Sequence, residues 1–143
     1  MASNQLVVVK DKVQRYLTDL LGNVQIDRDG DFNFRQGSAH VFVRVAPLGD
    51  ERTFVAVWAQ TNHEVPSSPE LFKYIATGNQ YRFGYLQCRE EDGKVSVAFT
   101  HRLLGDFLDP DELKMTVVLV AQSADEIDDE IMTKFGGRKF HED

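Results

Sequence analysis

The stretch HVFVRVAPLGDERTFVAVWAQT, residues 40–61, decides the fold. Its two halves, 40–46 and 52–61, are rich in the β-branched and aromatic residues that favour strands, and Pro47–Asp50 between them is a turn sequence. Because successive side chains of a strand point to opposite faces, both strands are apolar on each side. Such strands lie centrally in a sheet, or one face meets a partner. The opposing rows are Val41, Val43 and Val45 against Phe42, and Val55, Val57 and Ala59 against Phe54, Ala56 and Trp58.

Two further strand pairs flank this stretch. Upstream, the alternating pattern of Val24–Gln36 surrounds Asp29-Gly30, a dipeptide typical of tight hairpin turns. Downstream, residues 81–89 and 94–103 form a second hairpin around Glu90–Gly93. We therefore expect a sheet of six strands, of which the first two are short.

Three helices are predicted from capping signals and apolar periodicity. The first covers Gln5–Leu21, and a short second one follows Ser67-Ser68-Pro69-Glu70 and ends near Gly78-Asn79. The longest begins at Asp109–Glu112, with proline and acids in its first turn, and ends at Gly136-Gly137. Its apolar seam consists of Leu113, Val117, Val120, Ala124, Ile127, Ile131 and Phe135.

The expected fold class is α+β: one domain over residues 1–143 with an antiparallel sheet and the element order α-β-β-β-β-α-β-β-α. At this length a chain buries roughly 70% of its unfolded surface, so one core suffices. We expect the two long helices to cover one face of the sheet. Either the row with Phe42, Phe54 and Trp58 is left outside, or the helices cover that row and the valines face outward.

The charge balance argues against two classes of partner. Sixteen Lys and Arg against 23 Asp and Glu give a net charge of -7 and a pI near 5.0, which repels nucleic acid and anionic lipid. The apolar patch Leu6–Val9 is too short for a signal peptide or a membrane span. We expect a cytoplasmic protein that binds neither nucleic acid nor membrane.

Metal and cofactor motifs are weak or absent in the sequence. The four histidines stand apart at positions 40, 63, 101 and 141, and no nucleotide loop or nucleophile elbow occurs. The series Asp27, Asp29 and Asp31 alternates as in a calcium loop, but Phe32 stands where that loop needs glycine, which favours a solvated turn. The acidic run 125–130 is interpreted as a solubilising helix face, with a divalent cation or a basic partner as the alternative. We predict no cofactor.

Cys88, the single cysteine, lies in a strand-like segment. We interpret it as a buried, inert thiol, and a reactive nucleophile is the alternative. A catalytic or small-ligand site would have to bring together His40, His101, Cys88 and nearby acids in three dimensions.

Aromatic side chains supply the candidate binding residues. At a spacing of two on predicted strands, such residues either line a ligand groove or belong to the core. The candidates for contact with a partner are Phe42, Phe54, Trp58, Tyr81, Phe83 and Tyr85.

Two strings resemble a known family. AQSADEIDDEIMTKFGGRKF, residues 121–140, is similar to the C-terminal end of actinobacterial-type YbjN proteins, and LLGDFLDPDEL, residues 103–113, resembles the family's lead into that last helix. The element order also resembles that of class I type III secretion chaperones (Tir chaperone-like). The resemblance implies a non-enzymatic protein that binds an extended client segment along apolar surface and acts as a dimer, and for YbjN relatives a sensory or regulatory role.

Three functions follow from these patterns. The first is a protein- or peptide-binding module, chaperone-like or regulatory, that forms a homodimer and is not an enzyme. The second is an enzyme or small-ligand protein with a site assembled from dispersed His, Cys and acidic residues. The third is a structural subunit that only dimerises.

Overall fold

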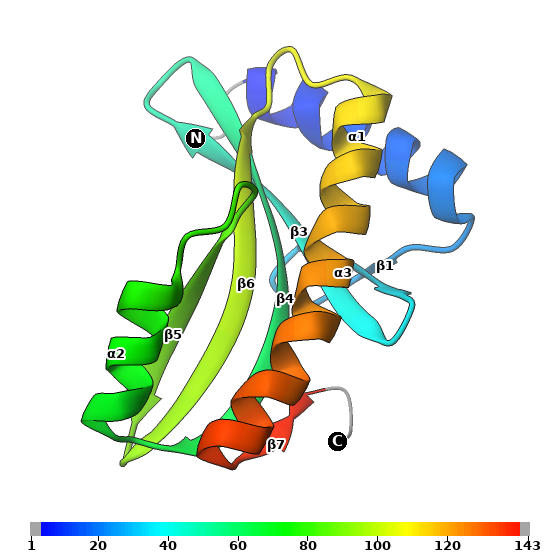
Figure 1. Ribbon diagram of the computed structural model, residues 1–143. Helices are drawn as coiled ribbons and strands as arrows, with labels where there is room; N and C mark the ends of the chain where they lie inside the picture. The colour runs from blue at the N-terminus through cyan, green and yellow to red at the C-terminus, as the bar shows by residue number, and fades with distance from the viewer. Residues whose placement is uncertain (1–3, 141–143) are drawn as a thin grey trace.

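The protein consists of a twisted antiparallel sheet with helices packed on one face. A computed structural model describes residues 4–140, and Figure 1 shows α1 and α3 crossing the sheet on the same side. The strand order is β1-β2-β3-β4-β6-β5, and β7 pairs with β4 off this path. The strands are β1 Gln25–Ile26, β2 Phe32–Gln36, β3 Ala39–Leu48, β4 Arg52–Pro66, β5 Tyr85–Glu91, β6 Lys94–Leu104 and β7 Arg138–Lys139, and the helices are α1 Asn4–Leu21, α2 Pro69–Gly78 and α3 Pro110–Phe135.

The helices begin where their capping residues predict. The Ser68 hydroxyl accepts a hydrogen bond from the Leu71 amide at 3.1 Å, and the Asp109 carboxylate accepts one from the Glu112 amide at 2.8 Å. These bonds satisfy amides that have no partner within the helix. The α+β class and the predicted order of helices and strands are confirmed.

The core lies between the helices and one row of each central strand. Val41, Val43, Val55 and Val57 are completely buried, and they belong to one cluster with the seam of α3. Helix α2 packs on the same side, because the Tyr74 ring meets the Phe135 ring of α3 edge-on at 5.2 Å. The valine rows therefore face the helices.

Strand β4 is longer than predicted and attaches the sheet to α3. It runs to Pro66 rather than Thr61, with irregular register between Gln60 and Asn62 and between Asn62 and Val65. At the irregularity the buried Asn62 amide donates a hydrogen bond to the Asp128 carbonyl of α3 at 3.0 Å. Such bulges bend a strand and redirect its side chains.

The chain forms one more strand than the six expected. After Gly136 and Gly137, β7 pairs with Asn62 and His63 of β4, beyond the end of β3. Gly137 has φ +80°, and a Cβ there would lie 2.8 Å from the Val65 side chain, so glycine is required for this close approach.

Strand β5 begins at Tyr85, four residues later than predicted. Gly84 has φ +75°, and a Cβ at this position would lie 2.5 Å from the ring of Phe99. The chain therefore turns at Gly84, and Tyr81 and Phe83 belong to the connection from α2 rather than to the strand. The period-two pattern of Tyr81, Phe83 and Tyr85 is not a strand pattern.

Strand β5 is an edge of the sheet, and a side chain closes part of it. The Asn79 amide group, at the end of α2, accepts a hydrogen bond from the Leu86 amide at 2.8 Å and donates one to the Leu86 carbonyl at 3.0 Å. The strand ends in Arg89, Glu90 and Glu91, and charged side chains are typical of protected edges.

The acidic run of α3 is not wholly a solvent face. Asp128 is buried, with 3% of its surface exposed, whereas Glu126, Asp129 and Glu130 are exposed. The prediction of a fully solvated acidic face was wrong at Asp128, because this position lies beside Asn62 of β4.

Candidate functional site

The face of the sheet opposite the helices is the candidate functional site, and we call it the open face. No helix among residues 4–140 lies over it (Figure 1). Alternation and register place there His40, Phe42, Arg44 and Ala46 of β3, Phe54, Ala56, Trp58 and Gln60 of β4, Ser96, Ala98, Thr100, Arg102 and Leu104 of β6, and Tyr85, Gln87, Arg89 and Glu91 of β5.

An aromatic row crosses the open face. The His40 and Phe42 rings stack with their centroids 4.7 Å apart, and the Phe42 and Trp58 rings stack at 5.5 Å. In the register of the sheet, Phe42 lies opposite Trp58, Trp58 opposite Thr100, and Thr100 opposite Tyr85. Phe42 and Trp58 are both partly exposed, so flat apolar surface remains in contact with water.

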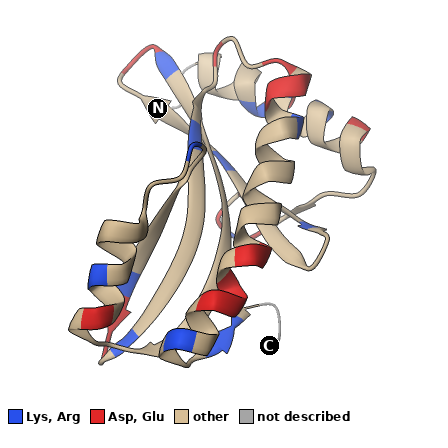
Figure 2. Ribbon diagram, in the orientation of Figure 1, with Lys and Arg blue, Asp and Glu red and all other residues tan. Residues whose placement is uncertain are grey.

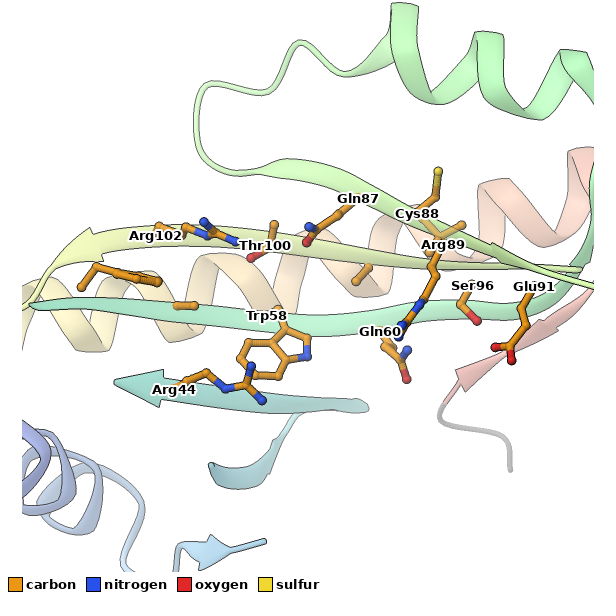
Figure 3. Close-up of a pocket in the computed structure, with 14 residues that line it drawn as sticks. Arg44, Trp58, Gln60, Gln87, Cys88, Arg89, Glu91, Ser96, Thr100 and Arg102 are labelled. Carbon is orange, nitrogen blue, oxygen red and sulfur yellow. The ribbon is translucent and has the colours of Figure 1, made fainter. Parts of the chain in front are cut away.

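A hollow of about 690 Å³ lies beside this row and extends over β4, β6 and β5. Figure 3 shows Trp58 and Arg44 side by side along one side of the group, while Arg89 reaches across from β5 toward Gln60. Small side chains, Ala56 and Ala98, form part of its floor. The hollow is therefore shallow and long, with aromatic and arginine side chains around it.

A basic row lies next to the aromatic row. Arg44 is opposite Ala56, and Ala56 is opposite Arg102. The Arg44 guanidinium donates two hydrogen bonds to the Asp31 carboxylate, at 2.8 and 2.7 Å, and these bonds raise the pKa of Arg44. Arg44 lies 5.4 Å from the centre of the Trp58 ring and Arg102 5.4 Å from that of Phe54, within the range of cation–π contacts.

The structure divides the six predicted partner-binding residues between the two faces. Phe42, Phe54, Trp58 and Tyr85 lie on the open face. Tyr81 and Phe83 lie on the helix side: Tyr81 meets the buried Phe99 edge-on at 5.2 Å, and Phe83 stacks on His101 at 3.9 Å. The turn at Gly84 separates these two from the others: Phe83 packs against the core, whereas Tyr81 is 36% exposed.

The structure does not bring the dispersed histidines and the cysteine together. His40 lies on the open face, whereas His101, opposite Val57, and Cys88, opposite Val97, have helix-side register. Partial burial lowers the pKa of both histidines, and at His40 the nearby Arg35 lowers it further. The arrangement of these three residues therefore does not support the hypothesis that they share one site.

Cys88 is exposed, so the prediction of a buried thiol was wrong. The reason is its place on the edge strand β5, which has only one neighbouring strand. The partial burial of the thiol and the nearby Glu90 carboxylate raise the pKa of Cys88. The thiol form therefore prevails at neutral pH.

The three aspartates of the first hairpin organise a turn. Oxygens of Asp27, Asp29 and Asp31 all lie within 4.8 Å of one another. Asp27 accepts hydrogen bonds from the amides of Asp29 and Asp31, at 2.9 and 3.0 Å, and Asp31 is bound to Arg44. Asp31 is 3% exposed rather than solvated, because it holds this arginine.

The arginines of the open face were missed by the sequence analysis. Arg44 and Arg102 share the alternation of Phe42 and Trp58, and that parity was a usable signal. The net charge of -7 does not reveal this local positive charge. His141 lies outside the described residues. No helix of the described part of the chain is long and apolar enough to cross a membrane.

Comparisons with known proteins identify relatives of the whole chain. Residues 8–143 match the family model TY-Chap1, described as "T3SS (YopN, CesT) and YbjN peptide-binding chaperone 1". No curated protein matches the sequence.

Two solved structures share the fold. The ExsC–ExsE complex contains a chain that is 18% identical, with a TM-score of 0.62, over 84% of this chain and 93% of that one. The Yersinia pestis type III secretion chaperone SycH, in complex with a stable fragment of YscM2, gives 14% identity and a TM-score of 0.55, over 82% of this chain and 98% of that one.

Proposed function

Because the chain belongs to the TY-Chap1 family of type III secretion and YbjN peptide-binding chaperones, we propose that it binds an extended segment of a client protein on its open face. Protein or peptide binding follows from the family, and the face is our assignment. The observation that carries it is the stack of Phe42 and Trp58, which stays partly exposed on the side of the sheet away from the helices.

The shape of the open face suits a chain segment. The hollow of about 690 Å³ extends across three neighbouring strands, whereas a small-ligand pocket encloses most of its ligand. A partner commonly buries about 800 Å² of each protein, an area that a flat aromatic face can supply. Among the fold relatives, ExsC is found in complex with ExsE, and SycH with a fragment of YscM2.

The proposal includes the biological setting. We place the protein in the cytoplasm, as a single domain over residues 1–143 that acts as a homodimer in a chaperone-like or regulatory role and binds rather than catalyses. The dimer is supported by the resemblance to class I chaperones. Sedimentation equilibrium of the full chain tests it, and a monomer at micromolar concentration would contradict it.

The binding face can be tested with a library of random 15-residue peptides displayed on phage. We expect the wild-type protein to enrich peptides and Trp58→Ala to lose that enrichment, since the substitution removes the larger ring of the exposed stack. Phe107→Ala is the matched control, because Phe107 is 84% exposed but lies in the connection between β6 and α3.

The same experiment has a spectroscopic readout. Trp58 is the only tryptophan, so a selected peptide that covers the open face should shift its fluorescence. If Trp58→Ala selects the same peptides with the same affinity as the wild type, the open face is not the binding site. Circular dichroism of each variant establishes that it is folded.

A further inference from the structure

We propose that the client segment is acidic as well as apolar, with a carboxylate two positions away from large apolar residues on either side. This inference rests on the proposed function, because it concerns the chemistry recognised by the open face. It arises from the arginines that the face presents within an acidic protein.

The open face has a charge opposite to that of the whole molecule. The protein carries a net charge of -7, and its carboxylates lie mainly on helices and turns (Figure 2). The face instead presents Arg44, Arg89 and Arg102, with Glu91 at its end. Because screening limits the reach of a charge to about 8 Å at physiological salt, a bound segment responds to these arginines more than to the net charge.

The three arginines differ in whether a carboxylate of the protein already binds them. Arg44 is neutralised in part by Asp31, which takes two of its five N–H donors. Neither Arg89 nor Arg102 has a carboxylate within 4 Å among residues 4–140. Their donors are available to a client carboxylate, and bidentate pairing with a carboxylate is the strongest interaction that arginine makes.

The order of the rows gives the spacing within the client. The basic row of Arg44, Ala56 and Arg102 lies between the aromatic row and a row of Ala46, Phe54 and Leu104. Leu104 is 71% exposed, so this outer row is also accessible. Rows on one face are two residues apart, about 6.8 Å, which is the distance between residues i and i+2 of an extended peptide. A segment lying along the strands therefore meets apolar, basic and apolar surface at i, i+2 and i+4.

Ala56 makes room for this arrangement. It stands between the two arginines of the basic row, lines the hollow with only a methyl group and is 8% exposed, so a client side chain that enters there meets mainly the flanking guanidinium groups. The same space is polar on both sides, which disfavours a third apolar residue.

Sequencing of the selected library peptides tests the inference. We expect the wild type to enrich Asp or Glu two positions from Leu, Ile, Phe or Trp. For one selected peptide, Glu→Gln should weaken binding about tenfold at low salt, and the difference should shrink at 0.5 M NaCl. Arg102→Gln should reduce the tenfold difference between the Glu and Gln peptides to about twofold, and this ratio is the readout, whatever the variant does to the affinity for both peptides. Arg15→Gln, an exposed position on α1, is the charge-matched control.

The outcomes separate this inference from the proposed function. Enrichment of apolar or basic peptides without acids, still lost in Trp58→Ala, would overturn the inference and leave the proposed site intact. If no peptide is enriched, or if sedimentation shows that Trp58→Ala separates a dimer whose second copy covers the face, the client site and the inference fall together.

Discussion

The two faces of the central sheet are built from adjacent residues but differ in composition and exposure. On the helix side, valines such as Val43 and Val57 are completely buried in one apolar cluster. On the open face, Phe42 and Trp58 stack in partial contact with water, beside arginines. The comparison teaches that a single step along β4 changes a residue from the buried core to partly exposed surface, because alternate residues of a strand point to opposite faces.

The largest effect should come from a charge on the helix side. Val57→Asp places an unpaired carboxylate in the core, and we expect a loss of about 4 kcal/mol of unfolding free energy, enough to unfold many domains of this size. Trp58→Asp, one residue further, should cost about 2 kcal/mol, because its carboxylate is hydrated and the ring that is lost is only partly buried. Urea titration followed by circular dichroism measures both.

The difference between the stability losses at positions 57 and 58 tests whether the two faces of the sheet are distinct. Equal losses at positions 57 and 58 would mean that the open face is also part of the core. A Trp58→Asp variant that stays folded but selects no peptides would sharpen the separation.

A smaller loss of stability should appear as the pH is lowered. Because the folded protein lowers the pKa of His40 and His101 below the ordinary value of 6.5, the unfolded chain binds protons more readily. The stability that depends on neutral imidazoles is therefore present above about pH 6.5 and declines as the pH falls below it. We expect the urea midpoint to decrease between pH 7.5 and 5.5.

His101→Phe isolates the helix side of this effect. The substitution keeps a ring to stack on Phe83 but removes the titrating group, so the decrease should be smaller than in the wild type. An unchanged pH dependence would show that His101 does not contribute to it. His40→Phe is the corresponding variant on the open face, where the ring stacks on Phe42.

The smallest effect on stability should come from Arg102→Gln. The side chain is exposed and contacts Phe54 through its guanidinium, so the unfolding free energy should change by about 0.5 kcal/mol or less. Thermal unfolding at two salt concentrations measures it. A much larger loss would give Arg102 a structural role and would weaken its assignment to client binding.

Sequence patterns predicted the helices well, because capping residues and apolar periodicity act locally. The seam of α3 from Leu113 to Ile131 is buried as expected, and Asp109 and Ser68 cap their helices. The pairing of strands around the turns at Gly30 and Gly93 was also predictable, since each turn sequence joins two strands that pair with each other.

Tertiary contacts determine the features that the sequence pattern left undecided or indicated wrongly. The direction of the valine rows depends on where the helices pack, which alternation alone does not specify. Gly84 looked like a strand residue because the period-two pattern reveals neither its positive φ nor its close approach to the ring of Phe99. Strand β7 has only two residues, too few for a periodic pattern, and Asp128 is buried because a bulge in β4 brings Asn62 beneath it.

The candidate site was predictable only in part. Four of the six aromatic residues lie on the open face, since they follow the alternation of true strands. The arginines between them required the register of three strands, because Arg44 and Arg102 become neighbours only through Ala56.

The hydrogen bonds of Asn79 with Leu86 bear on the behaviour of concentrated solutions. A free sheet edge is a template on which identical chains can stack into fibrils. Here the side-chain amide of Asn79 binds the backbone of one residue of that template, Leu86, and the far end of the strand carries Arg89, Glu90 and Glu91. In a member of a peptide-binding chaperone family, these features oppose the addition of a second copy of the chain to the free edge.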